Sequence, residues 1–242
     1  AGEVGVIVLA GGQGTRLGFS QPKGCFPGTA DPALLQGWIP SGKTLFRLQA
    51  ERMRKLQTTA TALVGGDSAK GKIQWYIMTS PMTHQATLDE FEANEYFGLN
   101  REQVKLFQQG TLPCIADEGT KFILNAPNQL ATAPDGNGGI YKALHTYGGN
   151  GGMIADMERH GVKYLFTNAV DNCVCKVADP LFMGFCIDGK VSAGNKVTEK
   201  REPHEKVGLQ CIRNGAYEVV EYSDVDPKIV EARDENGKLK MS

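Results

Sequence analysis

Blocks of apolar and polar residues predict strands and helices that alternate along the chain. Residues 4–10 (VGVIVLA) are apolar throughout and end at a glycine, which is typical of a short strand buried on both faces. Residues 43–57 instead place Leu45, Leu48 and Met53 near one face of a helix and charged side chains on the others. Similar patterns predict strands at 4–10, 73–78, 104–107, 164–166, 207–212 and 217–221. They predict helices at 43–57, 83–94, 137–147, 153–160 and 180–187.

The order of these elements predicts the fold class. Strand, helix, strand, helix, strand, followed by a mixed region, indicates an α/β, Rossmann-like fold with a mainly parallel sheet and helices on both faces. Residues 213–216 (RNGA) lie between the last two strands and are typical of a hairpin turn. Ligands bind such sheets outside the carboxyl ends of the strands, where residues 9–18 and 170–172 both lie.

Composition narrows the function classes. The chain has 242 residues, 41% of them hydrophobic, which is enough for a real core. A net charge of −1 argues against nucleic acid or an anionic membrane as partners, and no apolar run approaches the roughly 20 residues that span a bilayer. The first residues lack the basic region of a signal peptide. The six cysteines show no zinc-ligand spacing, so we expect reduced thiols in a cytoplasmic protein.

The stretch 9–18 (LAGGQGTRLG) is the main candidate for chemistry. Glycines at 11, 12 and 14 can adopt positive φ and let the backbone approach a ligand, so that successive amides form an anion site. Arg16 adds a forked, permanently charged donor, and Lys23 adds a mobile positive charge. The plainer alternative is a glycine-rich turn with two surface cations. The full pattern favours a loop that holds the phosphates of a nucleotide.

Two familiar nucleotide motifs are matched only superficially. Leu17 occupies the third glycine position of GxGxxG, so the dinucleotide motif fails. Residues 37–44 satisfy the P-loop pattern GxxxxGK[ST] letter by letter. A P-loop requires a preceding strand, yet 31–36 contains a proline and no β-branched residue, and Pro40 removes an amide. A P-loop NTPase at 37–44 stays the less favoured alternative.

Longer strings resemble the eukaryotic UDP-N-acetylhexosamine (UDP-N-acetylglucosamine) pyrophosphorylases. The stretch 9–18 followed by PKG at 22–24 looks like their signature, and the resemblance covers nearly the whole chain. Further matching strings are KTLF at 43–46, QAER at 49–52, YIMTS at 76–80, YFGL at 96–99, FQQG at 107–110, APDGNGGIY at 133–141, VDN at 170–172, KVADP at 176–180 and VVEYS at 219–223.

The resemblance implies an activity. It implies a nucleotide-diphospho-sugar transferase fold and a uridylyltransferase reaction, in which UTP and N-acetylglucosamine 1-phosphate give UDP-N-acetylglucosamine and pyrophosphate. The expected mechanism is metal-assisted, in-line attack of the sugar phosphate on the α-phosphate. Residues 1–242 would form a central catalytic domain, a fragment without the family's N-terminal and C-terminal parts. Alone, such a fragment is expected to bind nucleotide weakly without turnover.

The resemblance also implies a role for each site residue. The catalytic cations would be Arg16 and Lys23. Residues that contact the nucleotide would be Leu9, Ala10, Gly11, Gly12, Gly14, Gln109 and Gly136. Residues that contact the sugar would be Asn137, Gly208 and Glu221. Asp171 would hold Mg²⁺ or Mn²⁺, since a carboxylate suits a hard cation bound to phosphate.

Plainer roles remain open for several of these residues. Asp171 could form an Asx-turn, Gln109 could cap a backbone group, and Asn137 could be a helix N-cap. Glu221 could be solvated, and Asp135 could only stabilise its loop. None of the four histidines shows catalytic spacing. Whole-protein alternatives are a pyrophosphorylase for another sugar, such as UDP-glucose, and a sugar-nucleotide binding module without catalysis; the preference between GlcNAc and GalNAc and the oligomeric state are left open.

Overall fold

The computed structural model describes residues 2–26 and 41–240. The chain divides into two compact units, Ala1–Ile187 and Asp188–Ser242, each of which is described by itself. Short 3-10 turns, labelled η, cover Thr15–Leu17 (η1), Lys23–Cys25 (η2), Glu95–Gly98 (η3), Arg101–Gln103 (η4), Asn137–Gly139 (η5) and Tyr222–Asp224 (η6). Among the described residues, no helix has both the length and the apolar character that crossing a membrane requires.

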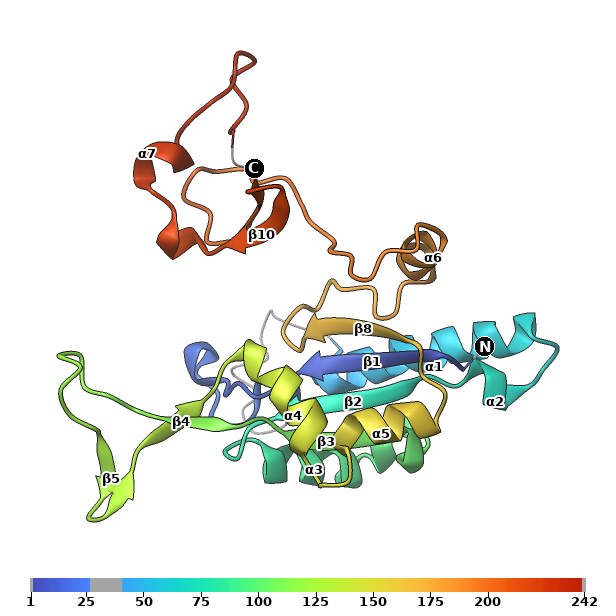
Figure 1. Ribbon diagram of the computed structural model, residues 1–242. Coiled ribbons are helices and arrows are strands. Elements are labelled where there is room, and N and C mark those ends of the chain that lie inside the picture. The colour runs from blue at the N-terminus through green and yellow to red at the C-terminus, as the bar shows by residue number, and fades with distance from the viewer. Residues whose placement is uncertain (1, 27–40, 241–242) are drawn as a thin grey trace. The chain divides into compact units, whose positions relative to one another are not determined.

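A four-stranded parallel sheet forms the centre of the first unit, in the order β3-β2-β1-β8 (Figure 1). This confirms the predicted α/β fold. Its strands are β1 (Val4–Leu9), β2 (Gln74–Thr79), β3 (Val104–Gln108) and β8 (Tyr164–Ala169). The prediction ended β8 three residues early, because polar residues interrupt its apolar run. Pairing with β1 continues to Ala169, which lies opposite Leu9, so neighbouring backbone extends the strand.

Helices cover both faces of this sheet, as predicted. Helices α1 (Leu45–Leu63) and α3 (His84–Ala93) pack on one face, and α4 (Ile140–Thr146) and α5 (Gly152–Arg159) on the other. The alternation of β1 divides its residues between the two layers, with Val6 and Val8 in the first and Ile7 in the second. All six residues of β2 are buried, as expected for a strand covered on both faces.

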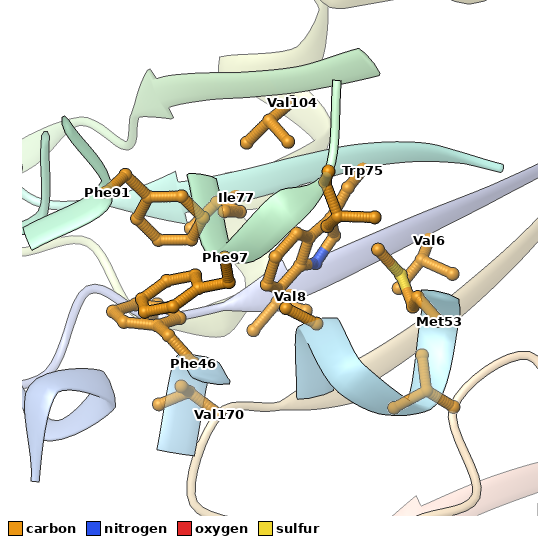
Figure 2. Packing of buried hydrophobic residues seen from close by; sticks show 14 of the residues in the cluster. Val6, Val8, Phe46, Met53, Trp75, Ile77, Phe91, Phe97, Val104 and Val170 are labelled. Atoms are coloured by element: carbon orange, nitrogen blue, oxygen red, sulfur yellow. The ribbon is translucent and has the colours of Figure 1, made fainter. Parts of the chain in front are cut away.

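Aromatic rings fill the layer between the sheet and α1 and α3 (Figure 2). Phe91 lies with its ring centroid 5.0 Å from that of Phe46 and 5.4 Å from that of Trp75, both in edge-on arrangements. Such pairs contribute about 0.5–1.5 kcal/mol beyond the burial of their area. Phe46 also packs against Gly24, where an added Cβ would lie 2.1 Å from the ring. This contact fixes the backbone beside Lys23.

Helix α1 begins two residues after the predicted start and buries a slightly different face. The Thr44 hydroxyl accepts a hydrogen bond from the Arg47 amide and caps the helix. The buried face runs through Phe46, Ala50 and Met53, whereas Leu48 is only half-buried. The helix continues six residues beyond the predicted end, and the four-residue helix α2 (Ser68–Gly71) packs on its last turns.

An antiparallel arm between β3 and α4 was not predicted. Its strands are β4 (Thr111–Pro113), β5 (Leu124–Ala126), β6 (Gln129–Leu130) and β7 (Thr132–Pro134). β4 pairs with β7 and β5 with β6, and Figure 1 shows the arm extending away from the sheet. These strands have two or three residues each and are largely exposed, so they carry no alternation that a sequence pattern could reveal. The arm returns the chain to the sheet just before η5.

The second unit contains the predicted hairpin. Strands β9 (Leu209–Arg213) and β10 (Ala216–Val220) pair antiparallel. The two residues between them, Asn214 and Gly215, have φ values of 52° and 80°, the pair of positive φ angles that a type I′ turn requires. Helix α6 (Pro180–Asp188) precedes this unit, and the short helix α7 (Pro227–Val230) follows the hairpin.

Candidate active site

The carboxyl ends of β1, β3 and β8, in one parallel sheet, bring the predicted site residues together. The Ala10 amide donates to the Met78 carbonyl at 2.7 Å, so the chain leaves β1 in register with β2. The Gln109 amide donates to the Thr79 carbonyl at 2.9 Å in the same way beyond β3. Val170, beyond β8, donates to the Leu9 carbonyl at 3.1 Å. The glycine-rich loop, Gln109 and Asp171 therefore start from one edge of the sheet, where α/β folds bind ligands.

The glycine-rich loop folds back on itself as a narrow turn. The Gly14 amide donates to the Gln21 carbonyl at 3.0 Å, and the Lys23 amide donates to the Gly12 carbonyl at 3.1 Å. These two bonds place Lys23 beside Gly12, although eleven positions of sequence numbering separate them. Arg16 lies on η1 at the far end of the same turn. The loop thus carries both predicted cations on one short, hydrogen-bonded segment.

The reason for glycine at positions 11, 12 and 14 differs from the prediction. None of the three has φ in the left-handed region; Gly18 adopts it instead, with φ of 68°. Crowding explains two of them: a Cβ on Gly11 would lie 2.0 Å from Gln109 Oε1, and one on Gly14 would lie 2.8 Å from the Phe19 ring. These glycines therefore allow close packing of neighbouring side chains, not an unusual backbone angle.

Lys23 and Asp171 form an ion pair at this edge. Lys23 Nζ donates to Asp171 Oδ2 at 2.9 Å, and the two side chains are 25% and 51% exposed. An ion pair this exposed contributes at most about 1 kcal/mol to folding. Both charges remain accessible, so the pair brings the predicted phosphate lysine and the predicted metal carboxylate within reach of one ligand.

Helix α1 holds the loop that carries Asp171. Gln49, 2% exposed, donates from Nε2 to the Val170 carbonyl at 3.0 Å. Arg52 donates to the Cys175 carbonyl at 2.9 Å, on the other side of Asp171. The family resemblance of the string at 49–52 implies no role for these residues. The available signal was a glutamine on the apolar face of a helix, four residues before Met53, because a buried amide requires a partner.

Gln109 joins the two predicted nucleotide segments. Its side chain is buried, with 6% exposed, and Nε2 donates to Asp135 Oδ1 at 2.9 Å and to the Gly136 carbonyl at 3.0 Å. Its Oε1 packs against Gly11. Gly136 has φ of 81°, where a side chain would be strained. The structure thus brings Gly11, Gln109 and Gly136 together.

The predicted sugar residues fall in two places. Asn137 follows Gly136 directly and is exposed on η5. The N-caps of η5 and α4 are Gly136 and Gly139, so the alternative of Asn137 as an N-cap is wrong. Gly208 and Glu221 lie in the second unit, where a Cβ on Gly208 would be 3.8 Å from Glu221 Oε1. These two residues neighbour each other across the β9–β10 hairpin.

The residues around Asp171 suit one kind of metal site. Within residues 2–26 and 41–240, no group of three or more His, Cys, Asp or Glu side chains could hold an ion. Mg²⁺ commonly takes one or two protein carboxylates and completes its shell with substrate phosphates and water. A single exposed carboxylate beside Lys23 fits that pattern. It does not fit a cation held by protein ligands alone.

The titratable side chains near the sheet have structural partners. The His84 ring bonds Thr79 Oγ1 at 2.8 Å, and burial lowers the pKa of this histidine. His160 Nδ1 lies 2.8 Å from the Asp156 carbonyl, and Asp156 accepts from the Tyr76 hydroxyl at 3.0 Å. Burial, the largest cause, raises the pKa of the Cys25 thiol to about 12, so this thiol is unreactive. All six cysteines are free.

The P-loop alternative loses support from the residues of 37–44 that the structure describes. Positions 37–40 lie outside the described residues. Lys43 Nζ donates to Glu51 Oε2 at 2.7 Å, and the Thr44 hydroxyl caps α1. A P-loop directs its lysine and its hydroxyl at phosphate and Mg²⁺, whereas here protein groups occupy both.

Comparisons with known proteins identify the family of this chain. The family model described as UTP–glucose-1-phosphate uridylyltransferase matches residues 2–241. UDP-N-acetylglucosamine diphosphorylase 2 of Arabidopsis thaliana is 45% identical over 235 residues, which are 96% of this chain and 44% of the relative. UDP-N-acetylglucosamine pyrophosphorylase of Saccharomyces cerevisiae is 43% identical over 99% of this chain and 46% of its own.

A solved structure extends the similarity to the fold. Uridine diphosphate N-acetylglucosamine pyrophosphorylase from Trypanosoma brucei, in complex with an inhibitor, is 33% identical and superimposes with a TM-score of 0.85. The match covers 99% of this chain and 45% of that one. The chain spans less than half the length of the curated relatives it matches. With the family model matched over nearly every residue, the chain belongs to the UTP–glucose-1-phosphate uridylyltransferase family, in which it is similar to relatives named UDP-N-acetylglucosamine diphosphorylase and pyrophosphorylase.

Proposed function

We propose that the protein containing this chain transfers a uridylyl group from UTP to N-acetylglucosamine 1-phosphate, giving UDP-N-acetylglucosamine and pyrophosphate. The observation that carries this proposal is the convergence of the Lys23–Asp171 pair with the glycine-rich loop and Gln109 at one sheet edge. The names of relatives at 43–45% identity support the same reaction. The six free thiols support a reducing, cytoplasmic location.

The main barrier in this reaction is repulsion between two polyanions. The sugar phosphate is already an anionic nucleophile, so no strong general base is required. Two like unit charges about 4 Å apart cost roughly 4 kcal/mol at an effective dielectric of 20. Cations and amides that hold both phosphates offset this cost and align the attack with the departing pyrophosphate. Lys23, Arg16 and the loop amides are the groups that we assign to this work.

The Lys23–Asp171 pair suits a ligand that carries negative charge. The carboxylate neutralises the ammonium and holds it beside the glycine-rich loop. A triphosphate offers Lys23 a stronger partner, because phosphate carries more charge than one carboxylate. Asp171 would hold Mg²⁺ or Mn²⁺, which supplies positive charge to the phosphate oxygens when bound. Gln109 and Gly136 would hold the base, and Asn137, Gly208 and Glu221 the sugar.

A second candidate is a pyrophosphorylase for glucose 1-phosphate. The observation that favours it is the matching family, UTP–glucose-1-phosphate uridylyltransferase, whose name includes that sugar phosphate. The two candidates share the nucleotide half of the site and differ only at the sugar. A panel of sugar 1-phosphates separates the two candidates, because the rate of pyrophosphate release can be compared directly between the sugars.

The test uses the full-length protein and a pyrophosphate-release assay. GlcNAc, GalNAc and glucose 1-phosphates are each supplied with UTP, and Lys23→Ala is compared with Lys43→Ala. We expect release with GlcNAc 1-phosphate, a loss of about 10²- to 10³-fold in kcat/KM for Lys23→Ala, and little change for Lys43→Ala. Loss of activity in Lys43→Ala alone would support the P-loop instead. If no sugar phosphate gives pyrophosphate release, the remaining alternative is a sugar-nucleotide binding module without catalysis.

A further inference from the structure

Asp135 lies at the centre of the contacts that hold Gln109. It follows β7 directly, and its amide donates to the Gly110 carbonyl at 3.1 Å. Its Oδ1 accepts the hydrogen bond from Gln109 Nε2 at 2.9 Å. Backbone and side chain therefore both tie Asp135 to the end of β3. The predicted roles for the site assigned no ligand to this residue.

Two glycines make room for the Asp135 carboxylate. A Cβ on Gly139 would lie 1.9 Å from Asp135 Oδ1, and a Cβ on Gly110 would lie 2.6 Å from Oδ2. Real Cβ contacts under 3.0 Å essentially never occur, so any larger residue at either position would displace the carboxylate. Both glycines belong to strings that match the family, FQQG and APDGNGGIY. The need to accommodate one carboxylate explains both.

These contacts leave the Gln109 amide only one orientation. Its NH₂ group faces two oxygens that can only accept, the Asp135 carboxylate and the Gly136 carbonyl. Rotation of the amide by 180° would turn Oε1 toward the same two acceptors and leave three oxygens facing one another. The amide oxygen is therefore held on the opposite side, against Gly11 of the nucleotide loop. Asp135 and the Gly136 carbonyl together determine which end of Gln109 a base can meet.

A fixed amide oxygen discriminates between pyrimidines. Uracil N3–H donates a hydrogen bond, which the amide oxygen can accept. N3 of cytosine instead carries a lone pair, which repels the amide oxygen. A glutamine that is free to rotate could present either end and would suit both bases. An unfavourable contact with the competing ligand is a general source of binding specificity.

We propose that Asp135 is a positioning residue that locks the Gln109 amide and thereby selects uracil over cytosine nucleotides. This inference rests on the proposed function and on the assignment of Gln109 to the base. A single unfavourable donor–acceptor match typically changes affinity about 10- to 100-fold, and the lock should contribute an effect of this size.

The test compares UTP and CTP as substrates of the full-length protein. The kcat/KM ratio of UTP to CTP is measured for the wild type, Asp135→Asn and Asp135→Ala. Asn at 135 can donate or accept, so it removes the preference that the carboxylate imposes on Gln109 while keeping the size of the side chain, and the Gly136 carbonyl alone still favours the original orientation. We expect the ratio to fall about tenfold or more in both variants. The exposed Asp117→Asn change, in the same arm, should leave the ratio unchanged.

A structural role alone would lower both rates together and preserve the ratio, and that result would overturn the inference. A wild type that uses UTP and CTP equally would overturn it as well. If Asp135→Ala fails to fold, Asp135→Asn and Gly139→Ala decide, since Gly139→Ala displaces the same carboxylate by contact. A wild type that releases no pyrophosphate from UTP would instead refute the proposed function, so the two failures are distinct.

Discussion

Neighbouring glycines in η5 should respond in opposite ways to the same substitution. Neither Gly138 nor Gly139 has φ in the left-handed region, so alanine fits the backbone at both. At Gly138 an added methyl group would meet nothing within 4 Å. At Gly139 it would lie 1.9 Å from Asp135 Oδ1. Gly138→Ala is therefore a matched control for Gly139→Ala.

The size of the difference follows from one hydrogen bond. Ordinary contact begins at 3.4 Å, so the Asp135 carboxylate must withdraw by about 1.5 Å, which ends its 2.9 Å bond with Gln109. A hydrogen bond to a charged group contributes about 1.5–3 kcal/mol, and the partial exposure of Asp135 favours the lower half. Alanine in place of glycine stabilises by about 0.4–1 kcal/mol through the unfolded chain. That term is common to both variants, so the difference between them is about 1.5–2 kcal/mol.

The assay is urea unfolding of the full-length protein, followed by fluorescence and by circular dichroism. We expect Gly138→Ala to unfold at slightly higher urea than the wild type and Gly139→Ala at lower urea, with the same dependence on denaturant. Equal midpoints for the two variants would refute the reasoning. That result would mean that the carboxylate moves aside without cost and does not hold Gln109.

Three further predictions concern other parts of the site. Asp171→Asn should lower the free energy of unfolding by less than about 1 kcal/mol, because the ion pair is exposed. The same change should reduce turnover at least about tenfold. A large loss of stability with unchanged turnover would contradict this prediction. Gln49→Met keeps the volume of the side chain but leaves the buried Val170 carbonyl unpaired. We therefore expect the free energy of unfolding, measured by thermal unfolding, to fall by about 1–3 kcal/mol, and UTP to bind more weakly. The change Gln85→Met, at an exposed position, should alter neither quantity. Burial lowers the pKa of folded His84 below its usual 6.5, so its contribution to stability is present above that pH and is lost as pH falls. His84→Gln should therefore lose less stability than the wild type between about pH 7.5 and about pH 5.5, measured by urea midpoints, and equal losses would show that other groups cause the decline.

The sheet and its helices could be predicted because long segments with clear apolar patterns indicate them. Residues 4–10 and 73–78 are nearly continuous apolar runs, and the strands they form are buried on both faces. The end of α1 could not be predicted, because three of residues 58–63 (TTATAL) are threonines, which have weak helical preference. Packing extends the helix there: a Cβ on Gly71 would lie 2.1 Å from Thr61 Oγ1, so α2 approaches this turn closely.

The arm between β3 and α4 could not be predicted from the periodicity of apolar residues. Its strands are too short to show an alternating pattern, and β4 pairs with β7 some twenty positions later in the chain. Such pairing depends on the meeting of two distant segments, not on the preferences of either one. The hairpin of β9 and β10 was predictable for the opposite reason, because Asn-Gly between two strands fixes the turn locally.

The sequence by itself determined which residue types gather at the site: glycines, two cations, an amide and a carboxylate, in strings that match a known family. Only the tertiary structure decided their partners. Lys23 meets Asp171 across 148 positions, and Gln49 meets Val170 across 121. Hydrogen bonds and ion pairs depend on distances of about 3 Å, which are set by the order of strands in the sheet. A linear pattern records the direction of a side chain relative to its own helix or strand, but not which other segment packs beside it.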